Sequence, residues 1–204
     1  MKSKIEIVLL MAMGIAFAAP QASFAEVITG QPAPDFSLTD VEGSPRSLSK
    51  YDGKYRVLEW TNPECPFVKK HYSSGNMQRL QETSVGQGVV WLSINSSAPG
   101  KQGNFPPERW RQILEERRSA ANATLLDPEG KVGKLYGAQT TPHLFIVDPK
   151  GILIYQGAID SIASADPADV PKARNHVQAA LEEAMAGKPV SVSSTQSYGC
   201  SVKY

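Results

Sequence analysis

Two cysteines are the residues of this sequence whose chemistry is most specific. Cys65 and Cys200 are the only ones, so a single intramolecular disulfide is possible. Cys65 follows a stretch at 55–60 that predicts an interior strand, and Pro66 suits the first turn of a helix. At such a junction, free N–H groups and the helix dipole can lower the pKa of a thiol from about 8.5 to roughly 3.5–7.5. Cys65 is therefore a candidate nucleophile, and an inert buried cysteine is the alternative interpretation.

The elements expected around Cys65 alternate between strands and helices. Strands are predicted at 36–38, 55–60, 89–94, 123–126, 144–147 and 152–155, and helices at 66–84 with an interruption at 73–75, at 106–118, at 132–136 and at 171–186. This alternation favours parallel pairing with helices on both faces, and the turn at 148–151 adds an antiparallel hairpin. We expect an α/β fold with a mixed central sheet of four or five strands.

The first 25 residues have the pattern of a secretory signal peptide. Lys2 and Lys4 precede an apolar run at 7–19, and the small residues Ser23 and Ala25 predict cleavage after position 25. The run is shorter than the roughly 20 residues that a membrane-spanning helix needs, so no membrane anchor is expected. The protein is therefore predicted to be periplasmic or secreted.

Charge and composition predict a single domain without nucleic-acid partners. The chain has 21 basic and 20 acidic residues and lacks the concentrated positive charge that nucleic acids require. We expect a signal peptide at 1–25, one domain at 26–187 and a tail at 188–204 that carries Cys200. Four arginines alternate with glutamates in the helix predicted at 106–118 and indicate a solvent-exposed face: Arg109, Arg111, Arg117 and Arg118.

Three sequence features together resemble a known superfamily. Residues 30–36, Gly-Gln-Pro-Ala-Pro-Asp-Phe, are followed by Cys65 at a strand-to-helix junction and by Thr141-Pro142 before the hairpin. The chain is similar to the thioredoxin superfamily, and specifically to its exported redoxin or peroxiredoxin-like branch, the alkyl hydroperoxide reductase/thiol-specific antioxidant grouping. The resemblance implies a three-layer thioredoxin-like fold. It also implies a cis bond at Pro142 that places backbone beside Cys65, able to pair with an extended substrate.

The cysteine motif departs from both patterns in that superfamily. Thioredoxins carry a second cysteine three residues after the first, and this chain has Val68 there. Peroxiredoxins carry their attacking cysteine at the position of Val68, with a threonine at the position of Cys65. A dithiol within one helical turn is therefore absent, so a catalytic cycle within the chain must use Cys200.

Glu59 lies six residues before Cys65, where thioredoxins keep a buried acid. Desolvation in a buried strand would raise the pKa of this carboxyl and suit it to proton transfer with a nearby thiol. A glutamate exposed at a sheet edge is the alternative. Lys69 and Lys70 could stabilise a thiolate further if either faced the sulfur.

Three hypotheses about function follow. In the first, an exported thiol-dependent oxidoreductase reduces disulfides or peroxides as an antioxidant enzyme, with Cys65 as the nucleophile, Cys200 as the resolving thiol and an external thiol as the reductant. This hypothesis needs Glu59 and Pro142 at the site and no cofactor or metal. In the second, a Cys65–Cys200 disulfide only pins the tail, which contributes roughly 4–5 kcal/mol in the chain-entropy model. The third is a binding module for an exported partner or for copper, with His71, His143 and Met77 as candidate ligands.

Overall fold

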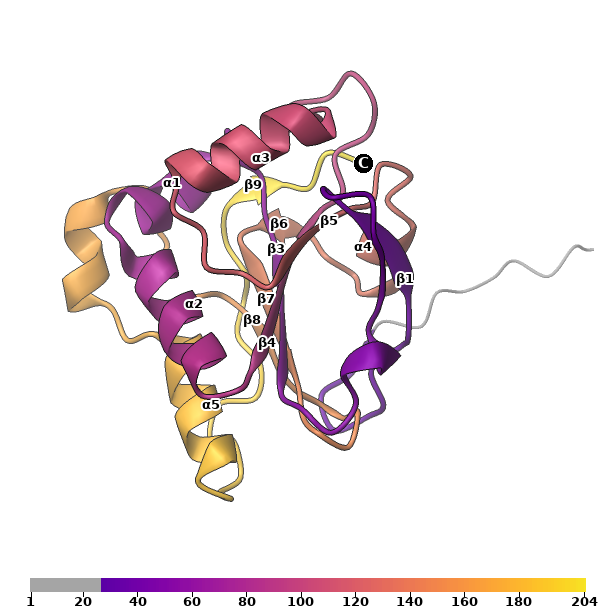
Figure 1. The fold of residues 1–204 in the computed structure, drawn as a ribbon. Helices are drawn as coiled ribbons and strands as arrows, with labels where there is room; N and C mark the ends of the chain where they lie inside the picture. Colours follow the sequence, from indigo (N-terminus) through magenta and orange to yellow (C-terminus); the bar gives the residue numbers. More distant parts are fainter. Residues whose placement is uncertain (1–26) are drawn as a thin grey trace, which may run out of the picture.

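The computed structural model describes residues 27–204 (Figure 1). The predicted signal peptide at 1–25 lies outside these residues. The strands are β1 (Ser37–Asp40), β2 (Pro45–Ser47), β3 (Arg56–Trp60), β4 (Val90–Asn95), β5 (Ala123–Leu126), β6 (Thr140–Thr141), β7 (His143–Val147), β8 (Leu153–Gly157) and β9 (Cys200–Ser201). The helices are α1 (Pro66–Ser73), α2 (Asn76–Gly86), α3 (Pro107–Glu116), α4 (Lys131–Leu135) and α5 (His176–Met185), with 3-10 turns η1 (Ser49–Tyr51) and η2 (Pro167–Lys172).

The central sheet is mixed, as the sequence predicts, but it is wider than expected. It has seven strands in the order β2-β1-β5-β4-β3-β7-β8, instead of the four or five predicted. Strands β3, β4 and β5 pair in parallel, and the other pairs are antiparallel. Strand β2 is a three-residue Pro-Arg-Ser segment without β-branched or aromatic side chains, so only its pairing with β1 makes it a strand.

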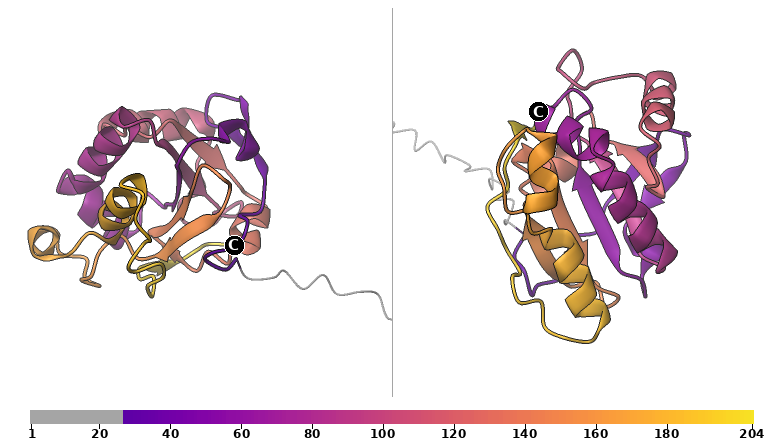
Figure 2. Two further views of the ribbon diagram at one scale, coloured as in Figure 1. Left: turned by 90° about the horizontal axis from the view of Figure 1, so that it is seen from below. Right: turned by 90° about the vertical axis from the view of Figure 1, so that its left-hand side faces the viewer.

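Helices cover both faces of the sheet (Figures 1 and 2). Helices α1, α2 and α5 pack on one face, around a core that includes Val68, Trp91 and Leu181. On the other face, Val132 of α4 and the following Tyr136 pack with Trp60 and Phe145. Every residue of β3, β4 and β7 is buried, as expected for strands covered on both faces.

The last helix begins five residues later than predicted. Residues 167–172 form the 3-10 turn η2, and α5 starts only at His176. Its N-cap is Asn175, whose side chain accepts a hydrogen bond from the N–H of Gln178 at 2.9 Å. The His176 N–H donates to the carbonyl of Ile159 instead of continuing a helix backwards.

The segment after α5 runs back along the molecule instead of leaving it (Figure 1). The N–H of Gln156 in β8 donates to Ser193, and the N–H of Thr195 donates back to Gln156. The chain then forms β9, which pairs with β6 in a separate two-stranded sheet. The C-terminal segment thus reaches the end of the molecule where α1 begins.

The cap of α5 gives a first prediction. Asn175→Ala leaves the Gln178 N–H without its acceptor and should lower the free energy of unfolding by about 1 kcal/mol. Asn175→Asp keeps an acceptor at the cap and should stay within a few tenths of a kcal/mol of the wild type. Denaturant unfolding measures both; equal losses in the two variants would show that the cap does not set the start of α5.

Candidate active site

Cys65 is the N-cap residue of α1, at the junction that the sequence predicts. The loop before it is held by Asn62, whose Oδ1 accepts the N–H of Glu64 at 2.9 Å and whose carbonyl accepts the N–H of Cys65 at 3.1 Å. The Cys65 carbonyl accepts the N–H of Lys69 and so starts the helical ladder. The Cys65 side chain is 0% exposed.

Three of the predicted site residues meet at this point. The Thr141–Pro142 peptide bond is cis, and the Cys65 Sγ donates a hydrogen bond to the Thr141 carbonyl at 3.0 Å. Cys200 pairs with Thr141 across the β6–β9 ladder. Cys200, which is half-buried, therefore lies beside Cys65, and both cysteines are free thiols.

The pKa values of the two neighbouring thiols are shifted in opposite directions. Burial by itself raises the pKa of Cys65, but the neighbouring Cys200 thiol, Thr141 and the N–H groups of Val68 and Cys200 outweigh burial and lower it. Burial and the interaction with the Cys65 sulfur raise the pKa of Cys200 to about 11. The proton of the pair therefore stays on Cys200 when Cys65 ionises.

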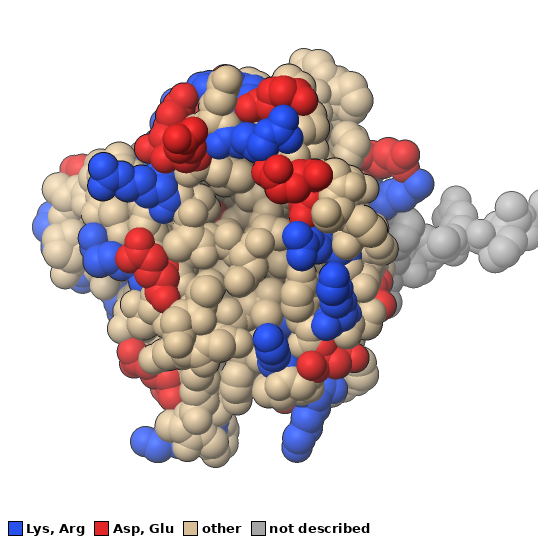
Figure 3. Space-filling model, in the orientation of Figure 1, with Lys and Arg blue, Asp and Glu red and all other residues tan. Residues whose placement is uncertain are grey.

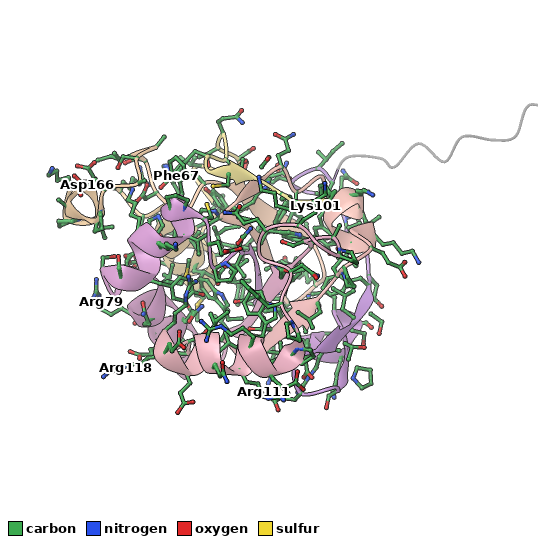
Figure 4. The ribbon with its side chains drawn as sticks, turned by 90° about the horizontal axis from the view of Figure 1, so that it is seen from above. Phe67, Arg79, Lys101, Arg111, Arg118 and Asp166 are labelled. Atoms are coloured by element: carbon green, nitrogen blue, oxygen red, sulfur yellow. The ribbon has the colours of Figure 1, made fainter. Side chains whose placement is uncertain are left out.

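The segment just before Cys200 is anchored by a cluster of the buried Lys70 and Asp160 with the half-buried Tyr198. Tyr198 Oη donates to Asp160 at 2.5 Å, and Lys70 Nζ lies 3.2 Å from the same carboxylate. The Tyr198 ring packs edge-on against Phe67, which Figure 4 shows at the start of α1 beside β9. Lys70 therefore binds the tail, not the Cys65 sulfur, and Lys69 is exposed.

The segment after Cys200 is anchored as well. Val202 donates its N–H to Gln139, and the carbonyl of Lys203 accepts the N–H of Ala98 at 2.7 Å. The Tyr204 ring covers Gly130 and Gly133, where any side chain would overlap it, and its hydroxyl donates to the Ala138 carbonyl. Cys200 thus lies between two fixed points of the tail.

Glu59 is buried, so the alternative of an edge-exposed glutamate is wrong. Its carboxylate accepts hydrogen bonds from four side chains: Tyr72, Gln81, Trp91 and Ser93. Burial raises the pKa of this carboxyl even though these donors lower it. No hydrogen bond joins Glu59 to Cys65 among the described residues, so proton transfer between them stays a prediction.

Arg117 differs from the expectation of a solvent-exposed arginine run. It follows the end of α3, is half-buried, and donates from Nη2 to the Pro63 carbonyl at 2.5 Å. Its guanidinium lies 4.7 Å from the centre of the Tyr72 ring. Arg109, Arg111 and Arg118 are exposed as predicted, and Figure 4 shows Arg111 and Arg118 at the surface. Arg117 therefore holds the loop that precedes Cys65.

The candidate copper ligands do not form a metal site in the structure. His71 contacts Asn76 and Tyr198 through its ring nitrogens, and burial lowers its pKa to about 4 despite the nearby Asp160 carboxylate. Met77 is part of the apolar core, and His143 Nδ1 accepts the N–H of Gln139. Within residues 27–204, no three His, Cys, Asp or Glu side chains are grouped to hold a metal ion.

The surface and the helices add two observations. On the face shown in Figure 3, acidic and basic side chains are interspersed. None of the helices between residues 27 and 204 combines the length and the apolar character needed to cross a membrane.

Comparisons with known proteins place the chain in a class and then in a family. The thioredoxin domain of a Bacteroides vulgatus thiol-disulfide oxidoreductase has the same fold, with a TM-score of 0.52 and 19% identity over 72% of this chain and 97% of that one. Residues 29–156 match the AhpC/TSA family, and the chain belongs to it.

Two relatives cover more of the chain. The thiol-disulfide oxidoreductase ResA of Geobacillus kaustophilus is 28% identical over 161 residues, which are 74% of this chain and 82% of that protein. A hypothetical protein of Sinorhizobium meliloti has a crystal structure with a TM-score of 0.74 and 25% identity, covering 88% of this chain and 96% of that one. The second likeness includes most of the described residues.

Sequence reasoning missed the residues that hold the tail. Tyr198 and Asp160 are far apart in the sequence, and neither stands in a recognisable motif. Gly199 offered one signal, because a glycine directly before a cysteine permits close approach of two backbones. Its φ is +139°, and a Cβ at this position would overlap the Thr141 carbonyl.

The buried carboxyl of Glu59 gives a second prediction. Because its pKa is raised in the folded protein, the folded state binds the proton more tightly, and the stability of the wild type should fall as the pH rises above 4.5. Glu59→Gln should remove that slope, so its stability relative to the wild type should grow by about 1.4 kcal/mol per pH unit until the raised pKa is passed. Urea unfolding between pH 4 and 8 measures the difference; a constant difference would contradict the raised pKa.

Proposed function

We propose that this protein is a thiol-disulfide oxidoreductase whose redox centre is the pair Cys65 and Cys200. The observation that carries the proposal is the contact between two free thiols of opposite acidity beside the Thr141–Pro142 bond. The name of the ResA relative, a thiol-disulfide oxidoreductase, supports the same reaction class. An inert buried cysteine would have no reason for a lowered pKa or for a second thiol at its sulfur.

The proposed reaction exchanges two thiols for one disulfide. In the oxidative direction, Cys65 and Cys200 lose two protons and two electrons and form an S–S bond. A substrate disulfide takes up these protons and electrons and becomes two thiols. Cys65 supplies the thiolate, because hydrogen bonds to its sulfur lower its pKa. Cys200 supplies the second sulfur that Val68 cannot, and the disulfide protects Cys65 from irreversible oxidation.

The backbone around Pro142 and the carboxyl of Glu59 have supporting functions in this proposal. The Thr141 carbonyl contacts the Cys65 sulfur and its strand holds the partner cysteine, so the Pro142 loop aligns the two thiols. Glu59 binds Tyr72 of α1 and Gln81 of α2 and thereby fixes the helices behind Cys65. Glu59 acts as a positioning residue in this arrangement.

The proposal predicts the effect of removing each thiol. With one equivalent of glutathione disulfide, the reduced wild type should form its intramolecular disulfide and release two glutathione molecules per protein. Cys65→Ser and Cys200→Ser should each release at most one and stop at a mixed disulfide, because each variant lacks one of the two sulfurs. Thr83→Ala, at an exposed position of α2, is the control and should release two, like the wild type. Release of two by both cysteine variants would refute the redox pair and favour the structural disulfide. The same variants assayed with hydrogen peroxide test the peroxide activity that the family resemblance implies.

We also propose that the protein acts in the periplasm or outside the cell. The charged start, the apolar run and the Ser23/Ala25 pattern support export, and export places the two cysteines where a disulfide can persist. N-terminal sequencing of the protein from its native cells should find Glu26 as the first residue. Soluble cytoplasmic protein that begins at Met1 would contradict this.

A further inference from the structure

We propose that outside thiols and disulfides exchange with this protein at Cys200, and that Cys65 exchanges only with Cys200. The inference rests on the proposed redox pair and reverses the entry point that the sequence suggests. Cys65 then is the internal partner, and the tail residue carries the bond to the outside molecule. The substrate class is a thiol or disulfide that can meet a half-buried cysteine on the surface without pairing with β6.

Access to the two sulfurs is the first argument. Cys65 is 0% exposed, whereas Cys200 is half-buried. Phe67 and Tyr198 pack against each other beside the site, and β9 occupies the pairing edge of Thr140 and Thr141. An outside molecule therefore reaches Cys200 first. An extended polypeptide could pair with β6 only after β9 had left.

The geometry of thiol–disulfide exchange gives the second argument. A thiolate attacks one sulfur in line with the S–S bond, from the side opposite to the leaving sulfur. For attack on Cys65, any line of approach must pass through the core in which Cys65 and Val68 are both 0% exposed. Cys200, in contrast, is half-buried and is followed by the exposed Ser201, so an approach from solvent exists at this sulfur. Attack while the tail is docked is therefore favoured at Cys200.

The leaving group gives the third argument. In exchange, the thiol of lower pKa leaves faster as a thiolate. Hydrogen bonds to its sulfur make Cys65 the more acidic of the two, and Cys200 has a pKa of about 11. Attack at Cys200 therefore expels the better leaving group into the site that stabilises it. Access and acidity favour the same sulfur.

Reduction and oxidation both pass through a mixed disulfide at Cys200. During reduction, an outside thiolate RS⁻ forms a bond to the Cys200 sulfur, the S–S bond breaks, and its electron pair leaves on Cys65 as a thiolate. A second RS⁻ then attacks the R sulfur, which yields RSSR and a Cys200 thiolate that takes up a proton. During oxidation, the Cys200 sulfur attacks RSSR and expels a first RS⁻, which takes up the Cys200 proton as RSH; the Cys65 thiolate then attacks the Cys200 sulfur and expels the second R group as RS⁻.

The two anchors of the tail make this relay efficient. Tyr198 is bound to Asp160 and Tyr204 lies over Gly130 and Gly133, so Cys200 stays beside Cys65 while it carries the outside group. A tethered thiol acts at an effective concentration in the millimolar range or above. Gly199 lets the backbone before Cys200 lie against the Thr141 carbonyl, where a Cβ would overlap it, and so keeps Cys200 next to Cys65.

The test identifies the cysteine that carries the outside group. The disulfide form of the full mature protein is mixed with reduced glutathione, quenched with acid within the first turnover, alkylated under denaturing conditions and mapped by peptide mass. We expect at least tenfold more glutathione on the Cys200 peptide than on the Cys65 peptide. An excess on Cys65, or equal amounts, would overturn the inference and leave the redox pair intact. Failure to form an intramolecular disulfide at all would refute the proposed function.

Single-cysteine variants test whether docking of the tail is the cause. With glutathione disulfide, Cys65→Ser should form its mixed disulfide at Cys200 at a readily measured rate. Cys200→Ser should react at Cys65 at least tenfold more slowly than the same variant in urea. Adding Tyr198→Ala to Cys200→Ser removes the hydrogen bond to Asp160 and the ring contact with Phe67, and should raise the Cys65 rate at least tenfold in the folded protein. A Cys65 rate that is already fast with Tyr198 present would overturn the inference.

Discussion

The pairing of β9 with β6 is the interaction on which the candidate site depends. The helix after Cys65 has Val68 where the thioredoxin pattern has a second cysteine, so under the proposed function the second thiol comes from elsewhere in the chain. Two residue pairs in one short ladder place it, with Cys200 opposite Thr141 and Ser201 opposite Thr140. The ladder is too short to hold by itself, and the contacts on both sides of it supply the rest.

Some of those contacts add little to the free energy of folding, but they fix one position of the tail. Lys70 and Asp160 are both buried, and burying an ion pair seldom adds stability over apolar packing. Here the pair gains the Tyr198 hydroxyl and the Ile162 carbonyl as further partners, so its polar atoms are satisfied. The cluster therefore specifies where the tail lies, and the opposite acidities of the two thiols depend on that position.

Local sequence signals predicted most of the fold and the residues around the Cys65 sulfur, but not the residues that hold the tail and the loop beside it. Hydrophobic runs, Pro66 and the 73–75 break placed the strands and the divided first helix correctly, because local chemistry determines them. Strand β2 and the start of α5 were missed, since tertiary pairing decides the first and one capping side chain the second. The positions of Tyr198, Asp160 and Arg117 could not be read from the sequence, because each depends on contacts between distant segments.

The distance between Cys65 and Cys200 along the chain also has a consequence for biosynthesis. More than 100 residues separate them, and a growing polypeptide presents Cys65 long before Cys200 exists. The sheet and α1 can form from residues that precede the tail, so Cys65 is placed at its helix before any strand covers it. The docking of β9 closes contacts of high sequence separation, which form late in folding. The candidate site is thus completed by a strand that leaves the ribosome after the other described strands.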